Sequence, residues 1–90
     1  MALYFLTYDL RGKRDYKTLY DELAKFKAVR MFQSSWCFKR YNTNAKGLRD
    51  YFKQFVDADD GLVVSQISID ENGYSQWAGY NMVNNPNQLN

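Results

Sequence analysis

The sequence predicts one α+β domain, and three observations lead to this prediction. Two segments repeat apolar residues at helical spacing, and four others are rich in the β-branched and aromatic residues typical of strands. These segments follow one another in the order strand, helix, strand, strand, helix, strand. The chain has only 90 residues, so it can form one hydrophobic core and has no room for a second.

The first strand covers residues 2–9 and is apolar at both alternating sets of positions. A strand with two apolar faces lies in the centre of a sheet and is covered on both sides. A polar turn follows, in which Asp15 is placed to accept hydrogen bonds from the first N–H groups of a helix. One face of the strand carries Tyr4, Leu6 and Tyr8, and the other carries Leu3, Phe5 and Thr7.

Each of the two helices is predicted from a single apolar stripe among charged and polar residues. The join at Ser34 and Ser35 is too short for a crossover, so residues 29–33 and 36–41 are expected to form a hairpin. Polar residues 42–44 then supply the turn and the cap of the second helix. The first stripe is Tyr16, Leu19, Leu23 and Phe26, and the second is Leu48, Tyr51, Phe52 and Phe55.

The last predicted strand covers residues 62–69. Right-handed crossovers place both helices on one face of a four-stranded antiparallel sheet, which is the ferredoxin-like βαββαβ sandwich. The opposite face keeps apolar residues that a monomer rarely exposes, so a second copy of the chain or an extra C-terminal segment is expected to cover it. That segment carries Tyr74, Trp77, Tyr80 and Met82. The domain is therefore predicted to span residues 1–83, and residues 84–90 are predicted to form a flexible tail.

Composition narrows the class of protein. Apolar residues make up 46% of the chain and aromatic residues 18%, which argues against disorder. The single Cys37 cannot form an internal disulfide, and the absence of His leaves no zinc ligand set, so this cysteine is predicted to lie in the core. The apolar run at residues 2–8 is far shorter than the ~20 residues of a membrane span, which predicts a cytoplasmic protein with no membrane partner.

Three short motifs occur in one order along the chain. Tyr8-Asp9-Leu10 closes the first strand, residues 32–36 cross the hairpin as Phe-Gln-Ser-Ser-Trp, and residues 57–64 enter the last strand as Asp-Ala-Asp-Asp-Gly-Leu-Val-Val. In this order and spacing they resemble the Cas2 family of CRISPR-associated proteins, and more closely its SinR-like branch from bacteria and phages. The resemblance covers about residues 2–69, together with a Trp-Ala-Gly-Tyr segment further on. It implies a ferredoxin-like fold and a homodimer.

Asp9 is the candidate catalytic and metal-binding residue. In Cas2 proteins the Asp that ends the first strand is the proposed metal-binding residue of a phosphodiesterase, and Asp9 holds that place here. A carboxylate can hold Mg²⁺, which polarises a phosphate and activates a water molecule. The resemblance therefore implies a metal-dependent endonuclease with Mg²⁺ as its cofactor. One carboxylate makes a poor magnesium site, so the other interpretation is that Asp9 only ends the strand and bonds to the following turn.

Some Cas2 proteins act as catalytically silent, DNA-bound scaffolds for the Cas1 integrase, so the resemblance also implies a nucleic-acid-binding or scaffold module. The net charge of +2 is too small to identify a nucleic-acid binder, and the distribution of charge has to decide. Six cations, some of them interleaved with Tyr and Phe, are the candidates for contact with DNA or RNA, and each is otherwise an ordinary solvated charge. They are Arg11, Lys13, Arg14, Arg30, Lys39 and Arg40.

A third class of function stays open, that of a small dimeric interaction protein such as a phage-encoded inhibitor of a host protein. A Tyr-rich surface of mixed charge suits a protein interface about equally well. Affinity that depends on phosphate contacts falls steeply with salt, whereas that of an apolar interface does not, so salt dependence separates the two classes. Binding is expected rather than catalysis, because the candidate site offers one carboxylate per chain and no His as a general base.

Overall fold

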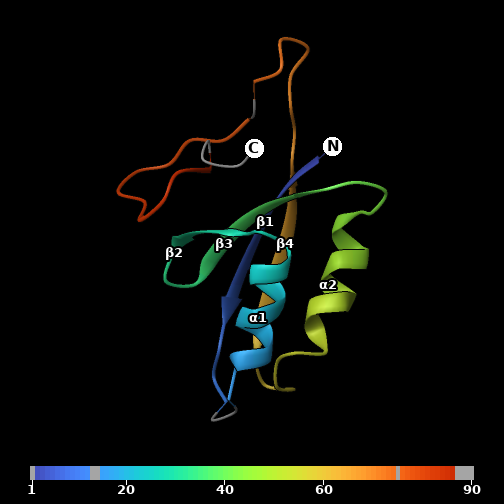
Figure 1. The fold of residues 1–90 in the computed structure, drawn as a ribbon, viewed down its shortest axis with the longest axis vertical. Coiled ribbons are helices and arrows are strands. Elements are labelled where there is room, and N and C mark those ends of the chain that lie inside the picture. The colour runs from blue at the N-terminus through green and yellow to red at the C-terminus, as the bar shows by residue number, and fades with distance from the viewer. Residues whose placement is uncertain (1, 13–14, 75, 87–90) are drawn as a thin grey trace.

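The computed structural model describes residues 2–12, 15–74 and 76–86, and its elements follow the predicted order (Figure 1). The strands form a four-stranded sheet, and two helices of nine residues each lie on one side of it. The elements are β1 (Ala2–Asp9), α1 (Lys17–Lys25), β2 (Val29–Phe32), β3 (Ser35–Arg40), α2 (Ala45–Lys53) and β4 (Gly61–Ile67).

The strand order of the sheet is β2-β3-β1-β4, so β3 and β1 form its centre. Every neighbouring pair of strands is antiparallel. β1 and β2 are joined through α1 and separated by β3, and β3 and β4 are joined through α2 and separated by β1. This split β-α-β arrangement is the ferredoxin-like one, so the predicted fold class is confirmed.

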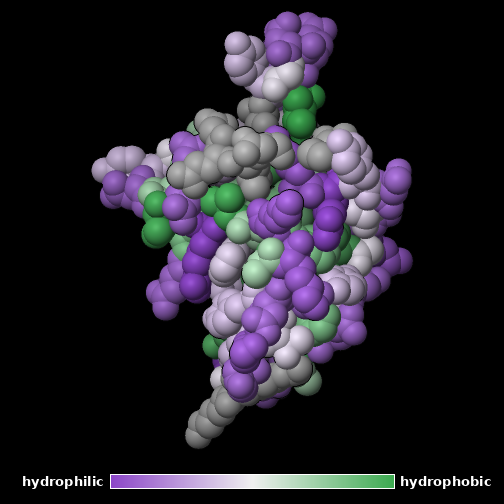
Figure 2. All heavy atoms as spheres, in the orientation of Figure 1, coloured by the Kyte–Doolittle hydropathy of each residue, from purple (hydrophilic) through white to green (hydrophobic). Residues whose placement is uncertain are grey.

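The face of the sheet under the helices holds the larger core. The β1 residues predicted for one face, Tyr4, Leu6 and Tyr8, all lie in it. Leu23 of α1 and Phe52 of α2 are completely buried against them. Other members of this core are Leu19, Phe38, Leu48 and Val56, with Tyr16, Phe26 and Phe55 partly buried beside them. Hydrophilic side chains dominate the molecule when it is viewed from the helix side (Figure 2), as expected for two amphipathic helices.

The hairpin turn lies one residue earlier than the sequence suggests. Gln33 and Ser34 form it, because Ser35 already belongs to β3 and pairs with Thr7 of β1. The N–H of Tyr8 donates to the Ser34 carbonyl at 3.0 Å. This bond ties the turn to the end of the central strand.

A side chain accepts a hydrogen bond from the first turn of each helix, but only α2 has a standard N-cap. Asn44 caps α2 as expected, since its side chain accepts from the Gly47 N–H at 2.7 Å. At α1, the Asp15 carboxylate accepts from the Lys17 N–H at 3.0 Å, although Tyr16 is the residue directly before the helix. Asp15 therefore satisfies one N–H group of the first turn, from one position further out than a standard cap.

The C-terminal segment covers part of the opposite sheet face. After β4 it extends past the end of the sheet and returns toward β2 (Figure 1). Trp77 packs edge-on against Phe5 of β1 with ring centroids 6.1 Å apart, and the Val83 N–H donates to the Met31 carbonyl at 2.8 Å. The cluster on this face consists of Leu3, Met31 and Cys37, with Phe5, Val29, Ile67, Trp77 and Met82 partly buried. One of the two predicted covers is therefore present, and the core position of Cys37 is confirmed.

Residues 84–86, which the sequence places in a flexible tail, contact the domain. The Asn84 side chain donates to the Arg30 carbonyl at 2.9 Å, and Pro86 is buried. Residues 87–90 lie outside the described part of the chain. Neither helix in the described ranges is long and apolar enough to cross a membrane.

Candidate functional site

Asp9 is the last residue of β1, and its side chain is exposed at the end of the sheet. Its Oδ2 accepts from Arg11 Nε at 2.9 Å, and the side chains of Asp9 and Arg11 are 68% and 60% exposed. Exposed ion pairs of this kind are weak and are screened by salt. Asp9 thus bonds to the turn that follows it, while its Oδ1 accepts no hydrogen bond from any described residue.

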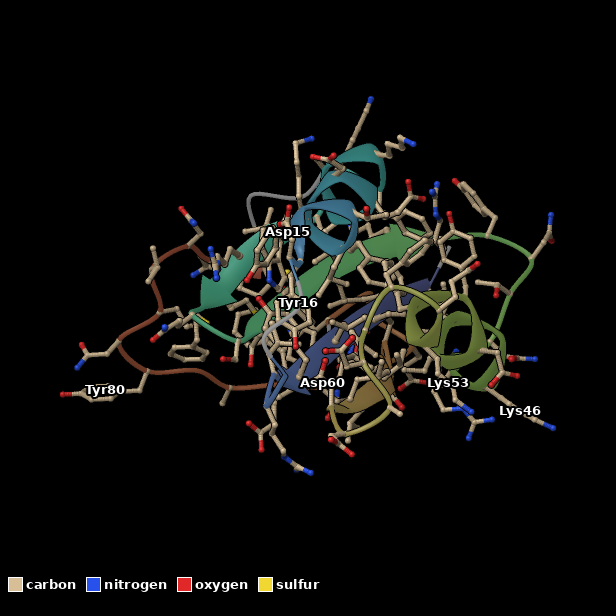
Figure 3. All side chains as sticks on the ribbon, turned by 90° about the horizontal axis from the view of Figure 1, so that it is seen from below. Asp15, Tyr16, Lys46, Lys53, Asp60 and Tyr80 are labelled. Atoms are coloured by element: carbon tan, nitrogen blue, oxygen red, sulfur yellow. The ribbon has the colours of Figure 1, made fainter. Side chains whose placement is uncertain are left out.

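A second aspartate, Asp60, ties two loops together at this end of the sheet. Its Oδ1 accepts from the backbone N–H of Arg11 at 2.6 Å and of Gly12 at 3.0 Å. Its Oδ2 accepts from the Tyr16 hydroxyl and from the Asp57 N–H, each at 2.7 Å. Figure 3 shows Tyr16 and Asp60 near each other, although they come from different loops, the one before α1 and the one before β4. We term this set of contacts the Asp60 latch.

The Asp60 latch shifts the pKa of both side chains that it joins. Partial burial acts to raise the pKa of Asp60, but the hydrogen bonds from Tyr16 and from three backbone N–H groups outweigh it and lower this pKa to about 2. Burial, together with the neighbouring carboxylate, raises the pKa of Tyr16 to about 12. Asp60 is therefore held ionised, and Tyr16 protonated, at neutral pH.

Close packing explains why residue 12 of the latch is a glycine. A Cβ atom at Gly12 would collide with the Asp57 carboxylate and would lie 3.0 Å from the Tyr16 hydroxyl. The backbone of the first loop thus lies directly against the second. The acidic motif that enters β4 therefore has a structural role, which is to join these two loops.

The acidic residues of the two loops do not form a metal site within the described ranges. Asp9, Asp57, Asp59 and Asp60 all belong to this end of the sheet, yet no three Asp, Glu, His or Cys side chains among the described residues gather closely enough to hold a metal ion. Both oxygens of Asp60 are engaged by the latch, and Asp9 is paired with Arg11. A Mg²⁺ site at Asp9 stays a prediction, and it would need further ligands from another copy or from the substrate.

Two of the predicted nucleic-acid contacts, Lys39 and Arg40, lie at the opposite end of the sheet from Asp9. β3 runs antiparallel to β1, so Arg40 pairs with Ala2 at the start of the central strand. The Arg40 guanidinium lies 3.7 Å from the centroid of the Phe26 ring, a cation–π contact that holds it against the end of α1.

Arg11 and Arg30 lie at the end where β1 finishes, and both are engaged in local contacts. Arg11 is bound in the Asp60 latch, and Arg30 donates from Nε and Nη2 to the Gln33 carbonyl at 3.2 and 2.6 Å. Lys13 and Arg14 lie outside the described residues. The four described candidates thus belong to two separate regions and do not form one surface.

A cationic face of α2 was absent from the predicted site residues. Lys46, Arg49 and Lys53 recur at spacings that place them on one side of the helix. Figure 3 shows Lys46 and Lys53 on the side of α2 turned away from α1. Neither lysine makes an ion pair or side-chain hydrogen bond with a described residue, while Arg49 contacts the neighbouring Asp50 at 2.8 Å. The spacing rule that reveals the apolar stripe also reveals these residues, which we term the α2 cationic face.

A groove runs between the α2 cationic face and β4. It consists of two hollows, which share Arg49 and Leu62 in their lining and are therefore adjacent. The first has a volume of about 370 Å³ and is lined by Ala45, Lys46, Arg49, Leu62, Val63 and Val64. The second has a volume of about 490 Å³, and its lining adds Lys53, Asp57 and Asp60. The groove thus has a cationic wall, an apolar wall and an acidic end.

The chain matches no protein-family model, and no solved structure matches it. The resemblance to the Cas2 family therefore stays a prediction that depends on the three sequence motifs. Two surface features are therefore left as candidate binding sites: the α2 cationic face with its groove, and the exposed end of β1 at Asp9.

Proposed function

We propose that the protein binds DNA or RNA through the sugar–phosphate backbone, as a binding or scaffold module, at the α2 cationic face. The observation that carries this proposal is the row of Lys46, Arg49 and Lys53, in which both lysines lack a carboxylate partner among the described residues. Free ammonium groups can replace the counterions condensed on a nucleic acid without first breaking an ion pair. The resemblance to Cas2 proteins supports the same function.

The dimensions of this row suit a nucleic-acid backbone. Lys46 and Lys53 are seven residues apart on α2, which corresponds to a rise of about 10 Å. Duplex DNA carries about one negative charge per 1.7 Å of its axis, so the row can meet several phosphates at once. Leu62 and Val63 form the apolar wall beside the row and offer packing surface to the sugars.

The acidic end of the groove limits where the backbone can lie. Asp57 and Asp60 line the groove near Lys53, and the latch holds Asp60 ionised. Like charges repel, so phosphates are disfavoured at this end. The backbone is therefore expected to cross the α2 cationic face and not to extend past Lys53 toward Asp57 and Asp60.

Two charge-matched double variants test the proposal. Lys46→Ala with Lys53→Ala, and Lys17→Ala with Lys25→Ala, each remove two positive charges and lower the formal net charge from +2 to 0. The first pair lies on the α2 cationic face, whereas Lys17 and Lys25 form ion pairs on α1. A difference between the variants therefore reports the position of the charges and not their number.

Binding is measured as the fluorescence anisotropy of labelled single-stranded and duplex oligonucleotides at several salt concentrations, with and without Mg²⁺. Each lost phosphate contact changes the slope of log affinity against log salt by about 0.9 for a duplex, so loss of both α2 lysines should make the slope shallower by about 1.8. The α1 variant should keep the wild-type slope. Equal changes in both variants would refute the α2 site, and wild-type protein without salt-sensitive affinity would favour the protein-binding function. A Mg²⁺-dependent cleavage product abolished by Asp9→Asn would establish the endonuclease instead.

We also propose that the protein acts as a homodimer in which the C-terminal segment contacts the second copy. This segment turns Trp77 toward the sheet but leaves other large apolar side chains outside. Tyr74, Tyr80 and Val83 are 71%, 83% and 74% exposed, and Figure 3 shows Tyr80 pointing away from the domain. Exposed apolar side chains that gather on one segment are typical of an interface. The resemblance to Cas2 proteins also implies a dimer.

A further inference from the structure

A separate hollow of about 200 Å³ lies at the Asp9 end of the sheet, between the hairpin turn and α1. It shares no lining residue with the groove beside α2. Its volume is that of about seven water molecules in the liquid, which suits a single small ring system and is too small for a base pair. The lining residues that can contact a ligand include Tyr8, Asp9, Tyr20, Arg30 and Gln33.

The Arg30 guanidinium lines the hollow and is held between two aromatic rings, Tyr20, which also lines the hollow, and Trp36, which lies behind the lining. Arg30 Cζ lies 5.5 Å from the centroid of the Tyr20 ring and 5.1 Å from that of Trp36. Arg30 also donates to the Gln33 carbonyl through Nε and Nη2. The Tyr8 hydroxyl accepts from Trp36 Nε1 at 3.1 Å and donates to the same carbonyl at 3.2 Å. This network fixes the guanidinium and leaves its Nη1 donors without an acceptor among the described residues.

The remaining lining supplies an acceptor and an accessible ring. Asp9 Oδ2 is occupied by Arg11, whereas Oδ1 accepts nothing within the described ranges. Tyr20 is 36% exposed, so a flat ligand can reach its ring. The hollow therefore combines a hydrogen-bond acceptor at Asp9, a charged donor at Arg30 and a stacking surface at Tyr20. The fold positions all three in the absence of a ligand.

We propose that this hollow binds one unpaired nucleobase and prefers guanine, an inference that rests on the proposed nucleic-acid-binding function. Guanine presents two adjacent N–H donors and a carbonyl oxygen on one edge. Asp9 Oδ1 accepts from the ring N1–H donor, and Arg30 Nη1 donates to O6 or N7, which is the contact that Arg makes most often with this base. The ring stacks on Tyr20. Adenine presents an acceptor where Asp9 requires a donor, so it fits less well.

A base inside a duplex is paired and stacked and cannot enter the hollow. An unpaired base in a single strand has both its ring face and its pairing edge available. The hollow therefore selects single-stranded nucleic acid, while the α2 cationic face binds the backbone of any strand.

The two tryptophans of the chain provide a reporter and an internal control. Trp36 bonds to Tyr8 and lies against Arg30, both of which line the hollow, whereas Trp77 packs against Phe5 on the opposite face of the sheet. In two-dimensional NMR spectra of the ¹⁵N-labelled protein, guanosine monophosphate should shift the indole signal of Trp36 and leave that of Trp77 in place. Addition to about 10 mM suffices, because a dissociation constant of about 1 mM then gives near-saturation. Adenosine monophosphate should bind at least about five-fold more weakly, and ribose 5-phosphate should cause no shift.

Three single variants complete the test. Tyr20→Leu should weaken the response to guanosine monophosphate, and Asp9→Asn should remove the preference for guanine over adenine. Tyr41→Leu changes a tyrosine that is 65% exposed and lies outside the hollow, so it should change neither. An unmoved Trp36 signal, an equal response to ribose 5-phosphate, or a guanine preference that survives Asp9→Asn would overturn the inference.

The double variant of Lys46 and Lys53 separates this inference from the proposed function. It should lose salt-sensitive affinity for oligonucleotides and keep the response of Trp36 to guanosine monophosphate. If oligonucleotides bind through the α2 cationic face while guanosine monophosphate leaves Trp36 unmoved, only the base-binding inference fails. If guanosine monophosphate binds in the hollow while oligonucleotides do not bind at α2, only the backbone site fails.

Discussion

Truncation of Phe52 to Ala should remove a large part of the stability of the domain. Phe52 is completely buried, and its ring centroid lies 5.0 Å from that of Phe26 and 5.8 Å from that of Phe38. These two rings come from the end of α1 and from β3 and cannot collapse freely into the cavity, so the loss should approach the usual range of about 3–5 kcal/mol for Phe→Ala in a core. The whole domain of 90 residues is expected to have a free energy of unfolding of only about 5–13 kcal/mol.

Urea unfolding followed by circular dichroism measures this loss, and Phe55→Ala is the matched control. Phe55 lies three residues further along the chain and is only partly buried. With an m-value of about 1 kcal/mol per M, Phe52→Ala should lower the unfolding midpoint by about 3–5 M or leave the chain unfolded in water. Phe55→Ala should lower it by clearly less. Equal midpoints for the two variants would refute the position of Phe52 at the centre of the core.

Two further predictions concern the Asp60 latch and the C-terminal segment. The pKa of Asp60 is about 2 in the folded protein, against an ordinary value of 3.8, so the latch contributes stability above about pH 4 that is lost as the pH falls toward 2. Asp60→Asn should flatten the fall of the melting temperature across that interval, and an equally steep fall in both proteins would contradict this role. Sedimentation at roughly tens of micromolar should show a dimer that Tyr80→Asp dissociates and Tyr41→Asp does not, whereas wild-type protein that stays monomeric would rule out the homodimer.

The order of the elements could be predicted because each segment carries its own period. Leu23 and Phe52 belong to stripes that are visible in a window of a few residues, and the two apolar faces of β1 already indicate a central strand. The sequence places the hairpin turn one residue late for a different reason. Ser34 and Ser35 are chemically identical, and only the pairing of Ser35 with Thr7 of β1 assigns it to the strand.

The candidate site was less predictable because its contacts join distant parts of the chain. Asp60 accepts from the Arg11 N–H across 49 positions of sequence, and no local pattern connects the two residues. Arg11 and Arg40 are equivalent as charges in the sequence, but the antiparallel direction of β3 carries Arg40 to the far end of the sheet. The α2 cationic face differs, since its spacing is local.

The Asp60 latch lies between the two proposed binding sites and influences both. Asp60 accepts from the backbone N–H of Arg11 and so fixes the position of this residue. The Arg11 side chain in turn donates to Asp9 Oδ2 and, through Nη1, to the Asp59 carbonyl at 3.3 Å. The occupied Oδ2 leaves Oδ1 of Asp9 as the acceptor for a base in the neighbouring hollow. On its other side, the ionised carboxylate of Asp60 lines the acidic end of the groove, and in the proposed complex its charge would keep phosphates on the α2 cationic face. A structural carboxylate that joins two loops can thus direct the bases to one side of this end and the backbone to the other, without contacting the nucleic acid itself.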